Sequence, residues 1–148
     1  MEYAEYFWAR ANENVTDGLM TIRRFKGRRP EIASVNDWLL DGDTVYTAFF
    51  KGAVWAYDLR KDESFVVFHP YDIYSWPTLL RKAGDWLLIG TRGEGLVLVN
   101  VKTWYLKRTK EVYLNIEQLS VTGNKIIVNE SIEFEVTSDD GSISSERE

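Results

Sequence analysis

Residues 39–59 read LLDGDTVYTAFFKGAVWAYDL, and this stretch decides the fold because it returns twice, in altered form, further along the chain. Each copy opens on a turn, at Gly42-Asp43, then Gly84-Asp85, then Gly123-Asn124. The turns recur at intervals of about 40 residues, a period typical of repeated supersecondary units. In each copy an apolar run, a reversal and a second apolar run follow the turn, so each copy is predicted to be a β-hairpin.

The apolar runs have the composition of β-strands. The first strands are TVYTAFF, WLLIGT and KIIVNE, and the second strands are VWAYDL, LVLVNV and IEFEV. Glycines at the first two reversals supply the positive φ that tight hairpins require, whereas the third reversal, near Glu130-Ser131, has no glycine. Nearly every residue of LVLVNV is aliphatic, which predicts a strand that stacked sheets cover on both faces.

The composition suits one domain with a hydrophobic core. The 148 residues are 45% hydrophobic, carry a net charge of −5 and include no cysteine. The lack of cysteine excludes disulfides and thiolate metal sites, and the acidic start MEYAEYFWARANE does not resemble a signal peptide, so we expect a cytoplasmic protein. No window suits a transmembrane helix, and the negative charge argues mildly against nucleic acid as the main partner.

We therefore expect a single β domain over residues 1–137 and a polar, disordered tail over residues 138–148. Residues 1–13 fit a helix and a strand equally well, and GLMTIRRF at 18–25 predicts one strand. The expected units of the domain are a partial repeat over 1–33 and repeats over about 34–74, 75–115 and 116–137.

Hairpins of this kind and period resemble the blades of β-propellers, and GAVWAYDLR at 52–60 resembles the end of a WD repeat. The resemblance spans residues 34–137. It is partial, because the only histidine, His69, follows the hairpin and no Gly-His pair precedes it. The resemblance, to this or a related propeller family, implies the blade architecture for this chain. It does not imply the hydrogen-bond network of the WD-repeat family. In place of that family's Trp-Asp pair stand Tyr57-Asp58, Val99-Asn100 and Val136-Thr137.

The number of repeats leaves the closure of the fold open. Propellers close with about 4 to 8 blades, and this sequence holds three full repeats and a fraction. Two copies could complete a ring as a homo-oligomer, a protein partner could supply the missing blades, or the fold could be a β-sandwich or a small barrel. The first two predict association, because open sheet faces expose apolar side chains.

The resemblance implies a non-enzymatic protein-protein interaction or assembly module. Tyr71, Tyr74 and Trp76 lie in one predicted loop between Pro70 and Pro77, and we expect them to bind a partner because such rings dominate many interfaces. The competing interpretation is that Trp76 fills the space between neighbouring sheets.

A basic segment, RRFKGRR at 23–29, supports an alternative function, the binding of nucleic acid or another anionic ligand. Alternation along a strand would split its charge between two faces, as in a solvated hairpin tip that protects a sheet edge. The candidate residues are Arg23, Arg24, Lys26, Arg28 and Arg29.

Residues suited to catalysis are few. His69 stands beside Pro70 at a strand end, which indicates a surface or loop residue. Glu133 and Glu135 alternate with apolar residues, which indicates the polar face of a strand. A hydrolase or lyase that uses carboxylates such as Glu133 and Asp43 is the second alternative. We expect no catalytic residue, cofactor or metal ion.

Overall fold

The computed structural model describes residues 17–27, 34–50, 52–70, 74–109, 115–123, 125–129, 132–136 and 143–146. These residues contain no helix and form antiparallel sheets, so the predicted all-β fold is confirmed. It follows that no helix in the described ranges could span a membrane.

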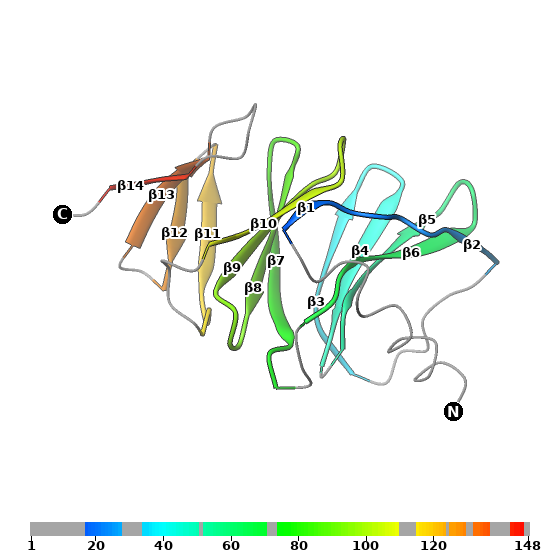
Figure 1. Ribbon diagram of the computed structural model, residues 1–148, viewed down its shortest axis with the longest axis horizontal. Coiled ribbons are helices and arrows are strands. Elements are labelled where there is room, and N and C mark those ends of the chain that lie inside the picture. The colour runs from blue at the N-terminus through cyan, green and yellow to red at the C-terminus, as the bar shows by residue number, and fades with distance from the viewer. Residues whose placement is uncertain are drawn as a thin grey trace.

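Three hairpin-built sheets stand side by side as a fan, with the second sheet between the first and the third (Figure 1). The first sheet contains β3 (Val35–Asp41), β4 (Thr44–Phe49), β5 (Val54–Asp58) and β6 (Glu63–Phe68). The second contains β7 (Pro77–Ala83), β8 (Trp86–Thr91), β9 (Leu96–Asn100) and β10 (Tyr105–Thr109). The third contains β11 (Leu119–Thr122), β12 (Lys125–Val128), β13 (Ile132–Val136) and β14 (Ile143–Glu146). Neighbouring sheets touch along their inner strands, because β7 lies against β3 and β4, and β11 lies against β7.

The glycine turns noted in the sequence join the first two strands of each sheet. Gly42, Gly84 and Gly123 have φ of 60°, 58° and 61°, a left-handed conformation that favours glycine. In the third sheet the residue that follows β12, Asn129, has φ of 51°. Asparagine tolerates this conformation better than most residues, which explains why the third hairpin needs no glycine there.

The described residues form three hydrophobic clusters: one on each side of the second sheet and a smaller one at the first sheet, made of Phe49, Ala53, Trp55 and Val66. The strand predicted to be covered on both faces, β9, is fully buried from Leu96 to Val99, so that prediction is confirmed. Between the first and second sheets the core includes Tyr46, Ala48, Ala56, Leu80, Leu87 and Ile89. Between the second and third sheets it includes Trp86, Leu88, Leu98, Leu119, Ile126 and Val128.

Residues 17–26, which we call the strap, run across the outer strands of two sheets (Figure 1, dark blue). β1 (Gly18–Leu19) pairs with β10 of the second sheet, and β2 (Phe25–Lys26) pairs with β6 of the first. The single strand predicted over 18–25 is therefore wrong. The outer edges of two different sheets each pair with two residues of the strap, and the residues between them cross from one sheet to the other.

Of the polar tail expected over residues 138–148, the structure describes only residues 143–146, which form β14. β14 pairs with β13, and a backbone ladder at a sheet edge requires no apolar side chains. The helix or strand expected over residues 1–13, like the rest of 1–16, lies outside the described residues.

Candidate functional site: the open flank of the first sheet

One hydrogen bond recurs at the inner strands of successive sheets. Asn36 Nδ2 donates to the Pro77 carbonyl at 2.8 Å, and the Thr78 hydroxyl donates to the Ile116 carbonyl at 2.9 Å. When the sheets are aligned on their glycine turns, the two donors occupy equivalent positions, and so do the two acceptors. The first and second sheets thus each use a polar side chain to hold the backbone at or just before the start of the next sheet.

A carboxylate and an arginine add a second connection between the inner strands. Asp37 Oδ2 accepts hydrogen bonds from the Leu80 backbone N–H and from Arg81 Nη1, both at 2.9 Å. Arg81 Nε donates to the Leu119 carbonyl at 3.0 Å. Arg81 therefore connects the inner strands of all three sheets.

We call the face of the first sheet that points away from the second sheet the open flank. The exposed fraction is 63% for Trp38 and 54% for Leu40 on the inner strand β3 of this flank, whereas Trp55 and Val66, further out, are buried. The cross-strand register places these residues of the flank on one face: Trp38, Leu40, Val45, Thr47, Trp55, Tyr57, Ser64 and Val66.

The flank corresponds to faces that are covered elsewhere in the molecule. Aligned on the glycine turns, Trp38 is equivalent to Leu80 in the second sheet and to Leu119 in the third. Leu80 is fully buried against the first sheet, and Leu119 is buried against the second. The flank is therefore the face that, on the other two sheets, receives the preceding sheet.

The outward face of the third sheet is polar by comparison. Lys125 is exposed, and the register places Glu135 opposite it and Glu133 opposite Ile127. Equivalent positions in the second sheet hold the buried Trp86 and Leu88. Where the second sheet has the buried Trp86, the third sheet thus has an exposed charged residue.

The predicted aromatic loop separates into two environments. Tyr74 is 69% exposed, whereas Trp76 is 8% exposed. The Trp76 ring meets Phe50 edge to face, with centroids 4.8 Å apart, and the Arg92 guanidinium lies 4.5 Å from its centroid. Trp76 thus packs between residues of the first and second sheets. Tyr71 lies outside the described residues, and the partner-binding role of Tyr71, Tyr74 and Trp76 stays a prediction.

The basic segment is spread over the outer part of the first sheet. The Arg24 guanidinium lies 4.2 Å from the centroid of the Phe65 ring, and Lys26 Nζ donates to the Lys61 carbonyl. Arg23 is exposed, while Arg28 and Arg29 lie outside the described residues. The anion-binding role of these five cations stays a prediction.

A half-open cleft of about 400 Å³ lies between the first and second sheets, near Arg24. Its charged residues come from four separate segments, so sequence reasoning named Arg24 as a candidate but did not find the cleft. Lys82 Nζ pairs with Asp41 Oδ2 at 2.9 Å. Burial, assisted by Asp41 and opposed by Arg24, raises the pKa of Tyr46 in the cleft to about 12. The charges of the cleft are mixed and select no single class of ligand: Arg24, Lys82, Lys102, Asp41 and Asp85.

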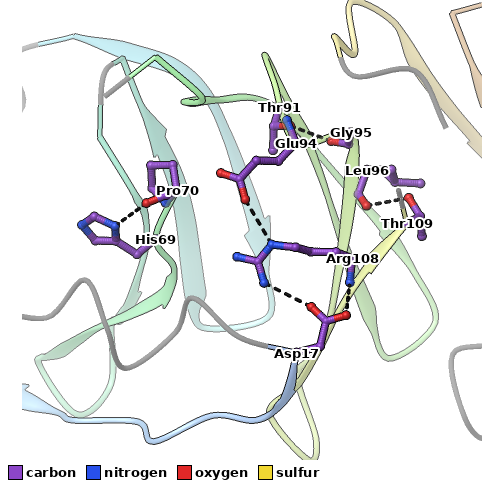
Figure 2. A network of polar contacts seen from close by, with 9 residues as sticks. All are labelled: Asp17, His69, Pro70, Thr91, Glu94, Gly95, Leu96, Arg108 and Thr109. Atoms are coloured by element: carbon purple, nitrogen blue, oxygen red, sulfur yellow. Dashed lines mark hydrogen bonds and ion pairs between the residues drawn. The ribbon is translucent and has the colours of Figure 1, made fainter. Parts of the chain in front are cut away.

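A buried arginine anchors the strap to the second sheet (Figure 2). Arg108 Nη1 is 3.1 Å from Asp17 Oδ1, and Arg108 Nε is 3.1 Å from Glu94 Oε1. The Arg108 backbone N–H also donates to Asp17 Oδ2 at 3.2 Å. The side chains of Arg108 and Glu94 are almost fully buried, so this network fixes the start of the strap.

His69 follows β6 in a connection between strands, as predicted, but its side chain is fully buried and not at the surface. Its Nδ1 lies 2.9 Å from the Pro70 carbonyl (Figure 2). The reason is that the chain leaving β6 passes through the interior, where residues 68–70 are all buried.

The carboxylates of the hydrolase alternative are not brought together. Asp43 lies in the turn of the first sheet, and its Oδ2 is 3.7 Å from Arg60 Nε. Glu133 belongs to the third sheet, with the second sheet between them (Figure 1). In the described part of the chain, no three histidine or acidic residues are grouped so that they could hold a metal ion.

Comparison with known proteins supports the architecture. No known family and no curated protein matches the sequence. Among solved structures, the β-propeller domain of Cps50 (Swd1) from Myceliophteria thermophila matches with a TM-score of 0.64 and 20% identity, over 80% of this chain and 48% of that one. The N-terminal domain of Nup159 matches with a TM-score of 0.57 and 19% identity, over 76% of this chain and 29% of that one.

A third match, an S. cerevisiae structure of Dbp5 bound to Nup159 and Gle1, has a TM-score of 0.59 and 19% identity, over 78% of this chain and 30% of that chain. This chain thus spans less than half the length of these three relatives in structure. The low identities show the fold alone. On that evidence, the three sheets have the architecture of β-propeller blades, as the partial resemblance in the sequence predicted.

Proposed function

We propose that this chain is a non-enzymatic protein-interaction module that binds a protein partner through the open flank. The observation that carries the proposal is the exposure of Trp38 and Leu40 at positions whose equivalents in the other sheets lie under a neighbouring sheet. A large apolar side chain contributes about 1.5–3 kcal/mol when it is fully buried. Tryptophan is also enriched among the residues that dominate protein interfaces.

Two further observations support this choice of surface. In the described part of the aromatic loop Tyr74 is exposed and Trp76 is buried, whereas the flank exposes both Trp38 and Leu40. Propeller-like chains of similar fold include one in a structure of Dbp5 bound to Nup159, so such a fold is compatible with protein binding.

Site-specific photocrosslinking tests the proposal. The full chain would carry a benzophenone amino acid at position 38, or at position 127 on the outward face of the third sheet as the matched control. After irradiation in extract of the cells that naturally make the protein, we expect one discrete protein adduct at position 38, suppressed by excess unmodified chain, and none at position 127. Equal adducts at both positions, or none at either, would contradict the proposal.

The captured partner is then identified and purified in free form, and its affinity for the full chain is measured by calorimetry. Trp38→Ala should weaken binding by about tenfold or more, which corresponds to about 1.4 kcal/mol. Tyr74→Ala serves as the comparison, because a loss of affinity from that change alone would move the interface to the aromatic loop.

A further inference from the structure

We propose that the open flank receives the inner strands of a β-sheet from another protein, packed as the first sheet packs on the second. This inference rests on the proposed function and names the kind of partner. The inference is based on a repeated interface, because the first sheet packs on the second in the way that the second packs on the third. The flank is the surface on which one more sheet would pack ahead of the first.

The apolar surface of the flank matches the receiving surface of the second sheet. There, Leu80, Leu87 and Ile89 are fully buried and pack against residues that include Ala48 and Ala56 of the first sheet. The equivalent positions on the flank hold Trp38, Val45 and Thr47, which are exposed or half-buried. A partner face of small and aromatic residues, like the face that the first sheet presents, would remove these side chains from water.

The hydrogen bonds of the two described interfaces indicate what else the partner supplies. The carbonyls of Pro77 and Ile116 each accept a bond from a polar side chain of the preceding sheet. Their equivalent on the first sheet is the carbonyl of Val35, so the partner is expected to present an Asn, Ser or Thr there. The backbone N–H of Trp38 already donates to Asp37 Oδ1 at 2.9 Å, so no carboxylate is needed from the partner.

The covered part of the flank limits the contact to the inner strands. Trp55 and Val66, on β5 and β6, are already buried. Apart from Tyr57 on β5, the flank residues left exposed or half-buried lie on β3 and β4, the same strands by which the first sheet touches β7. The partner therefore contacts β3 and β4.

A second copy of this chain fits the flank poorly. Its third sheet would present Lys125, together with the positions of Glu133 and Glu135, to an apolar surface, and removing charged groups from water is costly even when they are paired. If two copies of the chain met flank to flank, each would present a receiving face to the other. Neither copy would then place a side chain, as Asn36 is placed at the described interface, to donate to the Val35 carbonyl of the other. A different protein is therefore the occupant to which the geometry points.

The lack of cysteine allows a direct test, because Leu40→Cys introduces a unique thiol on the flank. A second copy of residues 34–74, which contains the first sheet, is joined by a flexible linker to the N-terminus of the full chain. Its face that normally packs on the second sheet can then dock on the flank. If nine-tenths of the added sheets dock, maleimide labelling of the thiol at position 40 slows about tenfold. Labelling of Ile127→Cys, in the same fusion, should not change.

A matched variant carries Ala48→Glu and Ala56→Glu in the added copy only, and it should restore fast labelling. Hydrogen exchange reports whether the added copy is folded. A folded copy with unchanged labelling at position 40 overturns the inference. So does an unfolded copy, because a receiving face should stabilise a sheet that matches it.

The unfused full chain distinguishes the other occupants. A dimer by light scattering, with position 40 protected, would show that a second copy covers the flank. Slow labelling that becomes fast when residues 1–16 are removed would show that this chain covers its own flank. Either result overturns the inference. If the added sheet does not dock but the photocrosslink at position 38 persists, the proposed function stands and only the kind of partner is wrong.

Discussion

The two outward faces of the fan differ in chemistry although the same repeated hairpin builds both. The first sheet turns Trp38 and Leu40 outward, whereas the third sheet turns Lys125 outward and has Glu135 opposite it in register. In a stack of repeats, the inner faces must be apolar, while a terminal face is polar where it meets water. The comparison shows that copies of one hairpin can carry either a charged or an apolar outward face, and the proposed partner site depends on this contrast.

The largest expected difference compares Leu80 with its equivalent on the flank, Trp38. Leu80→Ala should lower the free energy of unfolding by about 2–5 kcal/mol, because it leaves a cavity between two sheets. Trp38→Ala should cost less than about 1 kcal/mol in the isolated chain, because water already reaches the ring. Urea unfolding of both variants measures the contrast, and similar losses would mean that the flank is covered.

The third sheet offers a matched pair on consecutive residues of one strand. Ile126 is fully buried, whereas Ile127 is 38% exposed on the outward face. Ile126→Thr should cost about 2–3 kcal/mol, because a buried hydroxyl replaces part of an apolar side chain. Ile127→Thr should stay within about 0.5 kcal/mol of the original chain. Equal losses in thermal or urea unfolding would show that the outward face is also packed.

Substitution of Asp37 tests the hydrogen bonds by which this residue joins the inner strands of the first and second sheets. Asp37→Ala leaves the Leu80 N–H without its acceptor and removes the partner of Arg81, so a loss of about 1–3 kcal/mol is expected. Asp43→Ala, in the exposed turn of the same sheet, is the control and should change stability little. A loss at Asp43 as large as that at Asp37 would contradict a special role for the inner strands.

The smallest expected effect is a loss of stability at high pH, caused by Tyr46 on the covered face of the first sheet. Burial raises the pKa of Tyr46 from 10.0 to about 12, so the folded state keeps its phenol proton where the unfolded state has lost it. This contribution is fully present below pH 10 and falls as the pH rises towards 12, by about 1.4 kcal/mol near pH 11. Urea midpoints at pH 9 and 11 should show the fall, and Tyr46→Phe should remove that part of it.

Local signals in the sequence were sufficient to predict the hairpins. Gly42, Gly84 and Gly123 mark a conformation that few other residues adopt, and the aliphatic β9 is apolar on both faces because sheets cover both. Each of these signals depends on a few neighbouring residues. The hairpins, and the packing of sheets on both faces of β9, could therefore be predicted from the sequence.

The strap and the flank could not be predicted in this way. β1 and β2 are two residues each, and they are defined by pairing with β10 and β6, far away in the chain. Trp38 and Leu80 occupy equivalent positions in similar strands, and only the presence of a neighbouring sheet decides which of them is buried. The same holds for His69, whose burial depends on the path of the chain between sheets.

The strap also has a consequence for how the chain reaches its final form during translation. Asp17 and Arg108 are 91 positions apart, so at about 5–20 residues per second the ribosome adds Arg108 roughly 5–20 s after Asp17. Throughout that interval Asp17 lacks its anchor, because the outer edge of β10 does not yet exist. The start of the strap is thus fastened only after the second sheet has been made, and a slow step in biogenesis is expected at this closure.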